Sequence, residues 1–110
     1  MSEWTVVYYI DPRHRYPVLD FIASLPEAEQ AAAARDIDLL AEFGLQAPHV
    51  RPIEGQGWEL KSGSVRIFYV AYTAKRFVLL HGYYKKRQKA PAREIETAKR
   101  RLGDLLERDR

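Results

Sequence analysis

Cationic side chains follow two adjacent tyrosines at the end of one predicted strand. The run reads Tyr83, Tyr84, Lys85, Lys86 and Arg87, with Lys89 two residues further on. Aromatic rings stack on the bases of single-stranded RNA, and ammonium or guanidinium groups pair with its phosphates. The run is therefore interpreted as an RNA-binding edge of a sheet, with a solubilising charged loop as the alternative.

Arg66 lies inside another predicted strand, between the apolar residues Val65 and Ile67. A buried arginine is costly unless it pairs with an acid or lines a functional face. As a functional group it would clamp a phosphate through two parallel hydrogen bonds; the alternative is a structural ion pair with Glu59 or Asp11. Lys61, on the neighbouring strand, is placed to share that face.

Two further side chains are candidates for proton transfer. His81 titrates near neutral pH, but its position in an apolar strand favours a core histidine bonded to a backbone group. Glu94 falls in the first turn of the last predicted helix, where its charge suits the helix end; it is also placed to orient Lys86 or to act as a base. His14 and His49 show no ligand spacing, so no metal site and no cofactor is predicted.

Charge is distributed unevenly along the 110 residues. Residues 58–110 carry 14 basic and 6 acidic side chains, a net of +8, whereas residues 1–57 carry 4 basic and 9 acidic ones, a net of −5. Such polarity favours a polyanionic partner for one face of the molecule. There is no cysteine, which excludes disulfides and thiol chemistry. No apolar run approaches the roughly 20 residues of a membrane span, so a cytoplasmic protein is expected.

Strands and helices are predicted from composition and spacing. Strands are expected at about 4–10, 58–62, 64–72 and 77–84, and helices from Pro17, over 27–43, and from Pro91 onward. The stretch 46–57 is expected to be a loop. In the last strand, strict alternation would place Phe77, Leu79, His81, Tyr83 and Lys85 on one face. The last helix is expected to bury Ile95, Ala98, Leu102, Leu105 and Leu106 along one stripe.

These elements predict one α+β domain over residues 1–110, in the order β-α-α-β-β-β-α. The first strand has no neighbour in sequence with which a tight turn would pair it. It is therefore expected to join the later strands in one small, mostly antiparallel sheet packed with helices.

The ordered set of motifs resembles the RelE/ParE toxin superfamily, and within it the phage-derived HigB-like branch. The set comprises Trp58-Glu59-Leu60-Lys61, Arg66-Ile67-Phe68-Tyr69, Leu80-His81-Gly82-Tyr83-Tyr84-Lys85-Lys86, Pro91, Glu94-Ile95 and Ala98. The resemblance implies a compact RelE-like fold. It also implies a type II toxin whose cleaving members cut mRNA in the ribosomal A site without a metal ion. Its cognate antitoxin is expected to be a small helix-turn-helix DNA-binding protein.

By resemblance, Arg66, Lys85, Lys86 and Glu94 are the catalytic candidates. Lys61, Tyr83, Tyr84, Arg87 and Lys89 are the RNA-binding candidates. RelE itself carries a tyrosine near the position of Glu94, so the general base stays open among Lys86, Glu94, Tyr84 and His81. The expected function is a ribosome-dependent mRNA endoribonuclease. The alternatives are a ParE-like gyrase inhibitor without nuclease activity and an inactive RNA-binding member.

Overall fold

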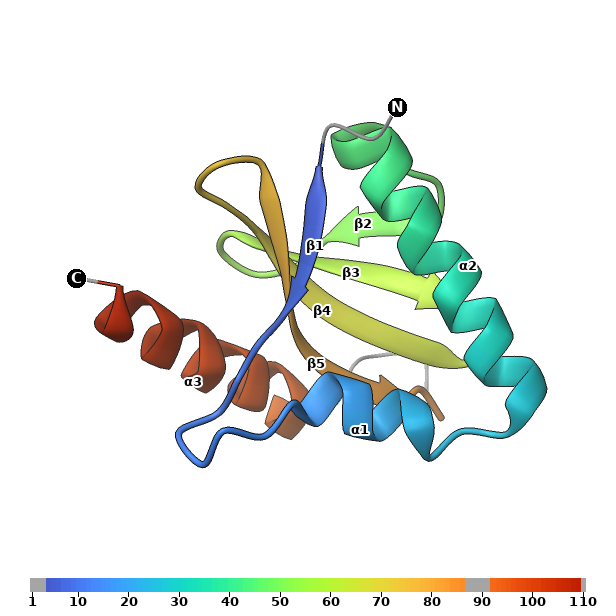
Figure 1. Cartoon of the computed structure of the whole chain (residues 1–110), viewed down its shortest axis with the longest axis horizontal. Helices are drawn as coiled ribbons and strands as arrows, with labels where there is room; N and C mark the ends of the chain where they lie inside the picture. The colour runs from blue at the N-terminus through green and yellow to red at the C-terminus, as the bar shows by residue number, and fades with distance from the viewer. Residues whose placement is uncertain (1–3, 87–91, 110) are drawn as a thin grey trace.

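The computed structural model describes residues 4–86 and 92–109 of the chain. The elements in these residues are β1 (Thr5–Tyr8), α1 (Pro17–Ala23), α2 (Glu27–Phe43), the 3-10 turn η1 (Gly44–Gln46), β2 (Val50–Pro52), β3 (Gly57–Ser62), β4 (Val65–Tyr72), β5 (Arg76–Tyr84) and α3 (Ala92–Arg108) (Figure 1). The described residues thus form three helices and one five-stranded sheet, which confirms the predicted α+β class.

Local sequence fixes the ends of the first two helices. Pro17 opens α1, since its restricted φ suits the first helical turn. α2 follows Pro26 and ends at Gly44, which has a φ of 59°. A Cβ at Gly44 would lie 2.4 Å from Nε1 of Trp4, so only glycine lets the chain pass against that indole ring. α1 begins at the predicted residue, and α2 occupies its predicted range.

The sheet has the strand order β1-β5-β4-β3-β2. β1 pairs with β5 in parallel, which confirms that the first strand joins the later ones across the two helices. The remaining pairs are antiparallel. The prediction that residues 46–57 form only a loop is wrong, because β2 pairs with β3 at the edge of the sheet. Pro52 is tolerated there, since an edge strand has one side without hydrogen-bond partners.

Helices cover both faces of the sheet, with α2 and α3 on opposite sides (Figure 1). The core on the side of α1 and α2 includes Val18, Leu40, Leu60, Ile67, Tyr69, Phe77 and Leu79. The core on the side of α3 includes Phe68, Val70, Val78, Leu80, Tyr83 and Ala98. On α3, Ile95, Leu102 and Leu105 contact this second core as predicted, whereas Leu106 is 44% exposed and departs from the predicted stripe. The predicted start of α3 at Pro91 lies outside the described residues.

A β-bulge changes which side chains of β5 share a face. Phe68 pairs with His81, but the next residue of β4, Tyr69, pairs with Leu79, so Leu80 is an extra residue in β5. The predicted strict alternation along this strand is therefore wrong beyond Leu80. Tyr83 packs in the α3-side core, on the face opposite to Leu79.

Gly82 brings α1 close to the end of β5. A Cβ at this position would lie 2.6 Å from Cδ2 of Phe21, so the absence of a side chain lets the ring of α1 pack directly on the strand. None of the helices in the described part of the chain combines the length and apolar character that a membrane crossing requires.

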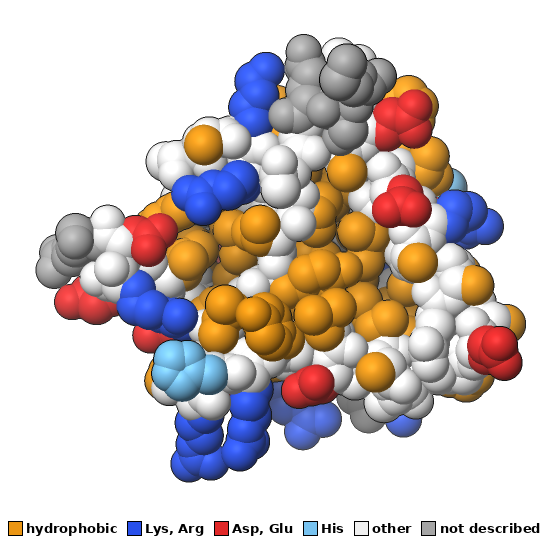
Figure 2. Space-filling view, in the orientation of Figure 1, with side chains coloured by type: hydrophobic (Ala, Val, Ile, Leu, Met, Phe, Trp, Pro, Cys, Tyr) orange, Lys and Arg blue, Asp and Glu red, His pale blue; other side chains and the backbone are white. Residues whose placement is uncertain are grey.

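The surface of the described residues carries several large apolar side chains. Figure 2 shows one face of the molecule, on which hydrophobic side chains gather across the middle while Lys and Arg side chains stand around the margin. The exposed large apolar residues are Tyr16, Leu19, Phe43, Leu45 and Leu106. Four of them belong to α1, to α2 or to the residues directly beside these helices.

Candidate functional site

An open pocket of about 270 Å³ lies where β2, β3 and β4 meet the residue that follows β5. Its lining is His49, Val50, Arg51, Glu59, Lys61, Arg66 and Lys85, and we call it the basic pocket. Four of these side chains are cations and one is an anion, a formal net charge of +3. The structure thus brings together Lys61, Arg66 and Lys85, which lie on three different segments of the sequence.

Backbone pairing places the cations of the basic pocket. Lys61 and Arg66 are directly opposite each other in the β3–β4 hairpin. The amide of Lys61 donates to the carbonyl of His49 at 2.8 Å, which holds the segment before β2 against β3. The amide of Lys85 donates to the carbonyl of Ser64 at 2.8 Å, which holds the chain after β5 beside the same hairpin. Residues from four segments therefore converge on one end of the sheet.

Arg66 is fixed by the backbone of its own hairpin. Its side chain is 11% exposed, and Nη1 donates to the carbonyls of Gly63 at 2.6 Å and Val65 at 3.0 Å. Its Nε lies 3.8 Å from Oε1 of Glu59. The pairing with Glu59 considered from the sequence is therefore present, and the guanidinium still lines the pocket. A cation held in this way is preorganised, because it does not have to be ordered when an anion binds.

Glu59 is the buried anion of the basic pocket. Its side chain is 2% exposed, and Oε1 accepts a hydrogen bond from Nε of Arg51 at 2.8 Å. On the other oxygen, the hydroxyl of Tyr83 donates to Oε2 at 3.4 Å. One carboxylate thus orients two arginines and a tyrosine on the same face of the sheet.

Tyr83 is not placed as the sequence predicted. It was expected at a solvent-facing edge, but it is 5% exposed, so its ring has no open face on which a base can stack. Burial, together with the charge of Glu59 and the hydrogen bond to it, raises the pKa of Tyr83 to about 12. Its hydroxyl therefore stays protonated at neutral pH and acts as a donor to Glu59.

Tyr84 lies on the opposite face of the sheet. Its hydroxyl donates to Oε2 of Glu29 on α2, and its ring packs edge-on against Phe21, with centroids 6.0 Å apart. The expected RNA-binding pair of tyrosines is therefore divided between the two faces. Lys86 is exposed and does not line the basic pocket. Two further RNA-binding candidates, Arg87 and Lys89, lie outside the described residues.

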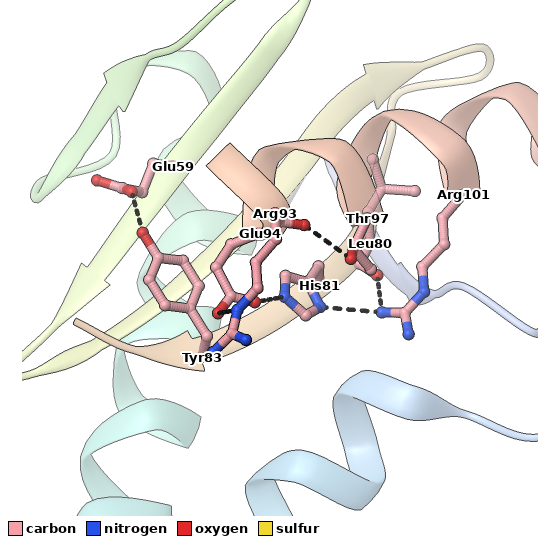
Figure 3. A network of polar contacts seen from close by, with 8 residues as sticks. All are labelled: Glu59, Leu80, His81, Tyr83, Arg93, Glu94, Thr97 and Arg101. Atoms are coloured by element: carbon pink, nitrogen blue, oxygen red, sulfur yellow. Dashed lines mark hydrogen bonds and ion pairs between the residues drawn. The ribbon is translucent and has the colours of Figure 1, made fainter. Parts of the chain in front are cut away.

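His81 forms a polar chain with two residues of α3 (Figure 3). Nη1 of Arg101 lies 3.1 Å from Nδ1 of His81, and Nε2 of His81 lies 2.6 Å from Oε1 of Glu94. Arginine only donates, so Nδ1 accepts, and the proton of the neutral ring is on Nε2 and is donated to Glu94. Burial lowers the pKa of His81, and the nearby charges of Arg101 and Arg100 lower it further, against the opposing effect of Glu94.

These contacts correct the expectation for His81. Its ring bonds to side chains of α3 and not to a backbone group. Glu94 occupies the first turn of α3, as predicted, and its carboxylate is engaged by His81. The rings of His81 and Tyr83 stack with centroids 5.9 Å apart and planes 14° apart. Side-chain contacts therefore run from Arg101 through His81 and Tyr83 to Glu59 in the basic pocket.

Arg51, His49 and Glu59 were not selected as site residues from the sequence. Arg51 belongs to β2, which was predicted to be loop, so its place beside Glu59 could not be inferred. Glu59 carried a usable signal: it is a charged residue between apolar neighbours of a strand, the same feature that singled out Arg66. Among residues 4–86 and 92–109, no three His, Asp or Glu side chains gather in a way that could hold a metal ion.

Comparison with known proteins identifies a family. The model of the family described as phage derived protein Gp49-like (DUF891) matches residues 20–103, which include the second half of α1, the whole of α2 and every lining residue of the basic pocket. No curated protein matches the chain. The chain belongs to the Gp49-like family, a phage-derived family of RelE-like toxins.

Proposed function

We propose that this member of the Gp49-like family is the toxin of a type II toxin–antitoxin pair, and that it cleaves mRNA on the ribosome without a metal ion. Family membership supports the coarser part of this statement, a toxin of RelE-like type. The observation that carries the finer part is the basic pocket, in which four cations surround one buried carboxylate. Within the RelE/ParE superfamily, the HigB-like branch is the proposed assignment.

The basic pocket suits a phosphodiester because its cations differ in mobility. Arg66 is held by two backbone carbonyls, and Arg51 is held by Glu59. Lys61 is exposed and Lys85 is half-buried, so their ammonium groups adjust to a bound strand. In the proposed reaction, the fixed arginines clamp the scissile phosphate and stabilise its developing negative charge. The two lysines neutralise its remaining oxygens.

The proposed reaction is an internal transfer within RNA. The 2′ oxygen attacks the adjacent phosphorus, its proton passes to a base on the protein, and the bond from phosphorus to the 5′ oxygen breaks. The products are a 2′,3′-cyclic phosphate and a 5′-hydroxyl end, whose proton comes from a protein cation such as Lys85. Tyr84 is removed from the candidates for the base, because its hydroxyl lies on the other face and donates to Glu29. Lys86, His81 and Glu94 remain.

A helix-turn-helix antitoxin is the proposed partner of the protein. Tyr16, Leu19, Phe43 and Leu45 are apolar, exposed and located beside or within the N-terminal helices. They lie in the acidic half of the chain and none of them lines the basic pocket, so an antitoxin that contacts them does not need to compete for its cations. Co-expression with the neighbouring reading frame tests the partnership; failure of its product to co-purify with the protein counts against it.

Primer extension on mRNA in a translating bacterial extract tests the activity. Wild type is expected to give new 5′ ends in ribosome-bound message and none in free message. Lys61→Gln and Lys85→Gln are expected to reduce the cleavage. Lys75→Gln, an equal charge change in the exposed turn between β4 and β5, is the matched control. Absence of cleavage by wild type would reject the nuclease proposal, and gyrase inhibition with intact message would favour a ParE-like activity.

A further inference from the structure

A second pocket rich in arginine lies between the β1–α1 connection and α3. It has a volume of about 260 Å³ and is lined by Tyr9, Asp11, Pro12, Arg13, Arg100 and Arg101; we call it the arginine pocket. We propose that the arginine pocket binds a second backbone phosphate of the same single-stranded RNA that the basic pocket holds. This inference rests on the proposed function and adds a second contact point for its substrate.

The charges of the arginine pocket are largely uncompensated. Its three guanidinium groups face one carboxylate, that of Asp11, which leaves a formal net charge of +2. Oδ1 of Asp11 already accepts the backbone amides of Arg13 and Arg15, each at 2.9 Å. Within the described residues, the side chains of Arg13 and Arg100 make no hydrogen bond and no ion pair. Their donors therefore face solvent and are available to an added anion.

The other polar groups of the arginine pocket have partners. The hydroxyl of Tyr9 donates to Oδ2 of Asp104 at 2.7 Å, and the same carboxylate oxygen pairs with Arg108. Neither Tyr9 nor Asp104 is therefore free to neutralise Arg13 or Arg100.

Arg101 has a different role from the other two arginines. Its Nη1 donates to the carbonyl of Leu80 at 2.9 Å and contacts Nδ1 of His81, so it is fixed to β5. Burial, and then the like charge of Arg100, lower the pKa of Arg101. A phosphate between them would relieve this repulsion and would match the planar donor fork of each guanidinium.

Side-chain contacts connect the two pockets. Figure 3 shows Glu59, Tyr83, His81 and Arg101 in one row across the sheet and the start of α3. Glu59 lines the basic pocket, and Arg101 lines the arginine pocket. An RNA strand carries a phosphate at every nucleotide, so a strand that enters one pocket presents further phosphates to the other. Two cationic pockets on the α3 side of the sheet favour an extended polyanion such as RNA over a separate acidic ligand.

RNA length separates the two pockets experimentally. The dissociation constant is measured for a 2′-O-methyl oligouridylate of about 12 nucleotides, which resists cleavage and is long enough for a single-strand binding surface. The same measurement is made by NMR titration for a uridine dinucleotide, which has a single phosphate. The variants are Arg13→Gln, Arg100→Gln and the double variant, and Lys75→Gln is the control. Arg101 is left intact because it holds β5.

We expect the double variant to bind the oligonucleotide about tenfold more weakly and the dinucleotide as wild type does. Its plot of log affinity against log salt should be shallower by about 0.7, the value for one phosphate contact on a single strand. Lys75→Gln should bind both ligands as wild type does. An equal loss of affinity for both ligands in the double variant would overturn the proposal. A loss of affinity that Lys75→Gln reproduces would also overturn it.

Two further outcomes separate this proposal from the nuclease activity. Oligonucleotide binding that depends on Lys61 and Lys85 but not on Arg13 and Arg100 would reject the arginine pocket and leave the proposed function standing. Binding that depends on Arg13 and Arg100, in a protein that cleaves no ribosome-bound message, would support the pocket and reject the function. Displacement of the oligonucleotide by hexaglutamate at equal charge concentration would overturn the assignment of RNA as its ligand.

Discussion

Replacing Glu59 with glutamine is the most informative single change in the basic pocket. Glu59→Gln keeps the size and planarity of the side chain but removes the one negative charge among the lining residues. Glu59 accepts from Arg51 at 2.8 Å and lies 3.8 Å from Arg66. The variant therefore tests whether this buried carboxylate holds the two arginines in place.

The expected loss of stability follows from these contacts. A hydrogen bond between charged groups contributes about 1.5–3 kcal/mol. The side chain of Arg51 is 56% exposed and solvent screens its pair, while the pair with Arg66 is buried but long. We therefore expect Glu59→Gln to lower the free energy of unfolding by about 1–2 kcal/mol. For a chain of this length that corresponds to a fall in Tm of about 4–10 °C.

Binding and cleavage are expected to change in opposite directions. The formal charge of the basic pocket rises from +3 to +4, so its affinity for an RNA phosphate should increase about twofold, less at high salt. The arginines lose their orienting acceptor, and small misplacements in an active site cost up to about a hundredfold in rate. We expect ribosome-dependent cleavage by Glu59→Gln to fall at least about tenfold.

Thermal unfolding followed by circular dichroism, RNA binding by fluorescence anisotropy and primer extension measure these three quantities. Glu42→Gln, which removes an exposed carboxylate of α2, is the matched control and should behave as wild type. Wild-type Tm and cleavage in Glu59→Gln would refute the claim that Glu59 positions the arginines. A parallel loss of binding and cleavage would instead mean that Glu59 contacts the RNA itself.

Three further changes test other parts of the structure. Gly82→Ala places a Cβ 2.6 Å from an aromatic ring of α1 and should destabilise the protein by about 1–3 kcal/mol. Gly103→Ala adds a Cβ with nothing within 4 Å in the exposed part of α3 and should stabilise the protein by up to about 1 kcal/mol. Denaturant unfolding measures both changes. Because burial lowers the pKa of His81 below 6.5, the unfolded chain takes up this proton first, so stability should fall as the pH drops below about 6.5. His81→Asn should flatten that part of the pH–stability curve and the exposed-site control His14→Asn should not; equal curves would contradict the buried neutral ring. Lys61→Gln should make the salt dependence of RNA binding shallower by about 0.7, and an unchanged slope would place Lys61 outside the phosphate contacts.

Features that depend on neighbouring residues could be predicted from the sequence. Pro17 and Pro26 mark the starts of two helices because proline restricts φ to values that suit a first helical turn. Gly44 marks the end of the second because glycine tolerates the positive φ found there. The β3–β4 hairpin was predicted for the same reason, and with it the shared face of Lys61 and Arg66.

Features that depend on residues distant in the sequence could not be predicted from it. β2 has three residues and one of them is Pro52, so its pairing with β3 has no local signature. Arg51 was missed for this reason. The bulge at Leu80 depends on the register between β4 and β5, and it moved Tyr83 and Tyr84 to the faces opposite to those that strict alternation gave.

The structure gives the positions of the predicted site residues but does not test their roles in RNA binding or cleavage. The structure places Lys61, Arg66 and Lys85 in one pocket, and it places Glu94 on His81. Whether these side chains bind or cleave RNA stays a prediction, because their geometry suits a phosphate without identifying the reaction. The arginine pocket is likewise visible only in the folded chain, since Arg13 and Arg100 meet through the packing of α3 beside the β1–α1 connection.

Cleavage of ribosome-bound mRNA by protein that has been freed of metal by dialysis against EDTA, mapped by primer extension, tests the central claim most directly. We expect the metal-free protein to cleave within translated codons in a buffer whose only divalent ion is the Mg²⁺ that the ribosome requires. Cleavage should fall at least about tenfold in the double variant Lys61→Gln, Lys85→Gln. Lys75→Gln should cleave as wild type does. Intact message with wild-type protein, or equal cleavage by wild type and the double variant, would contradict the assignment of the basic pocket as the site of RNA cleavage.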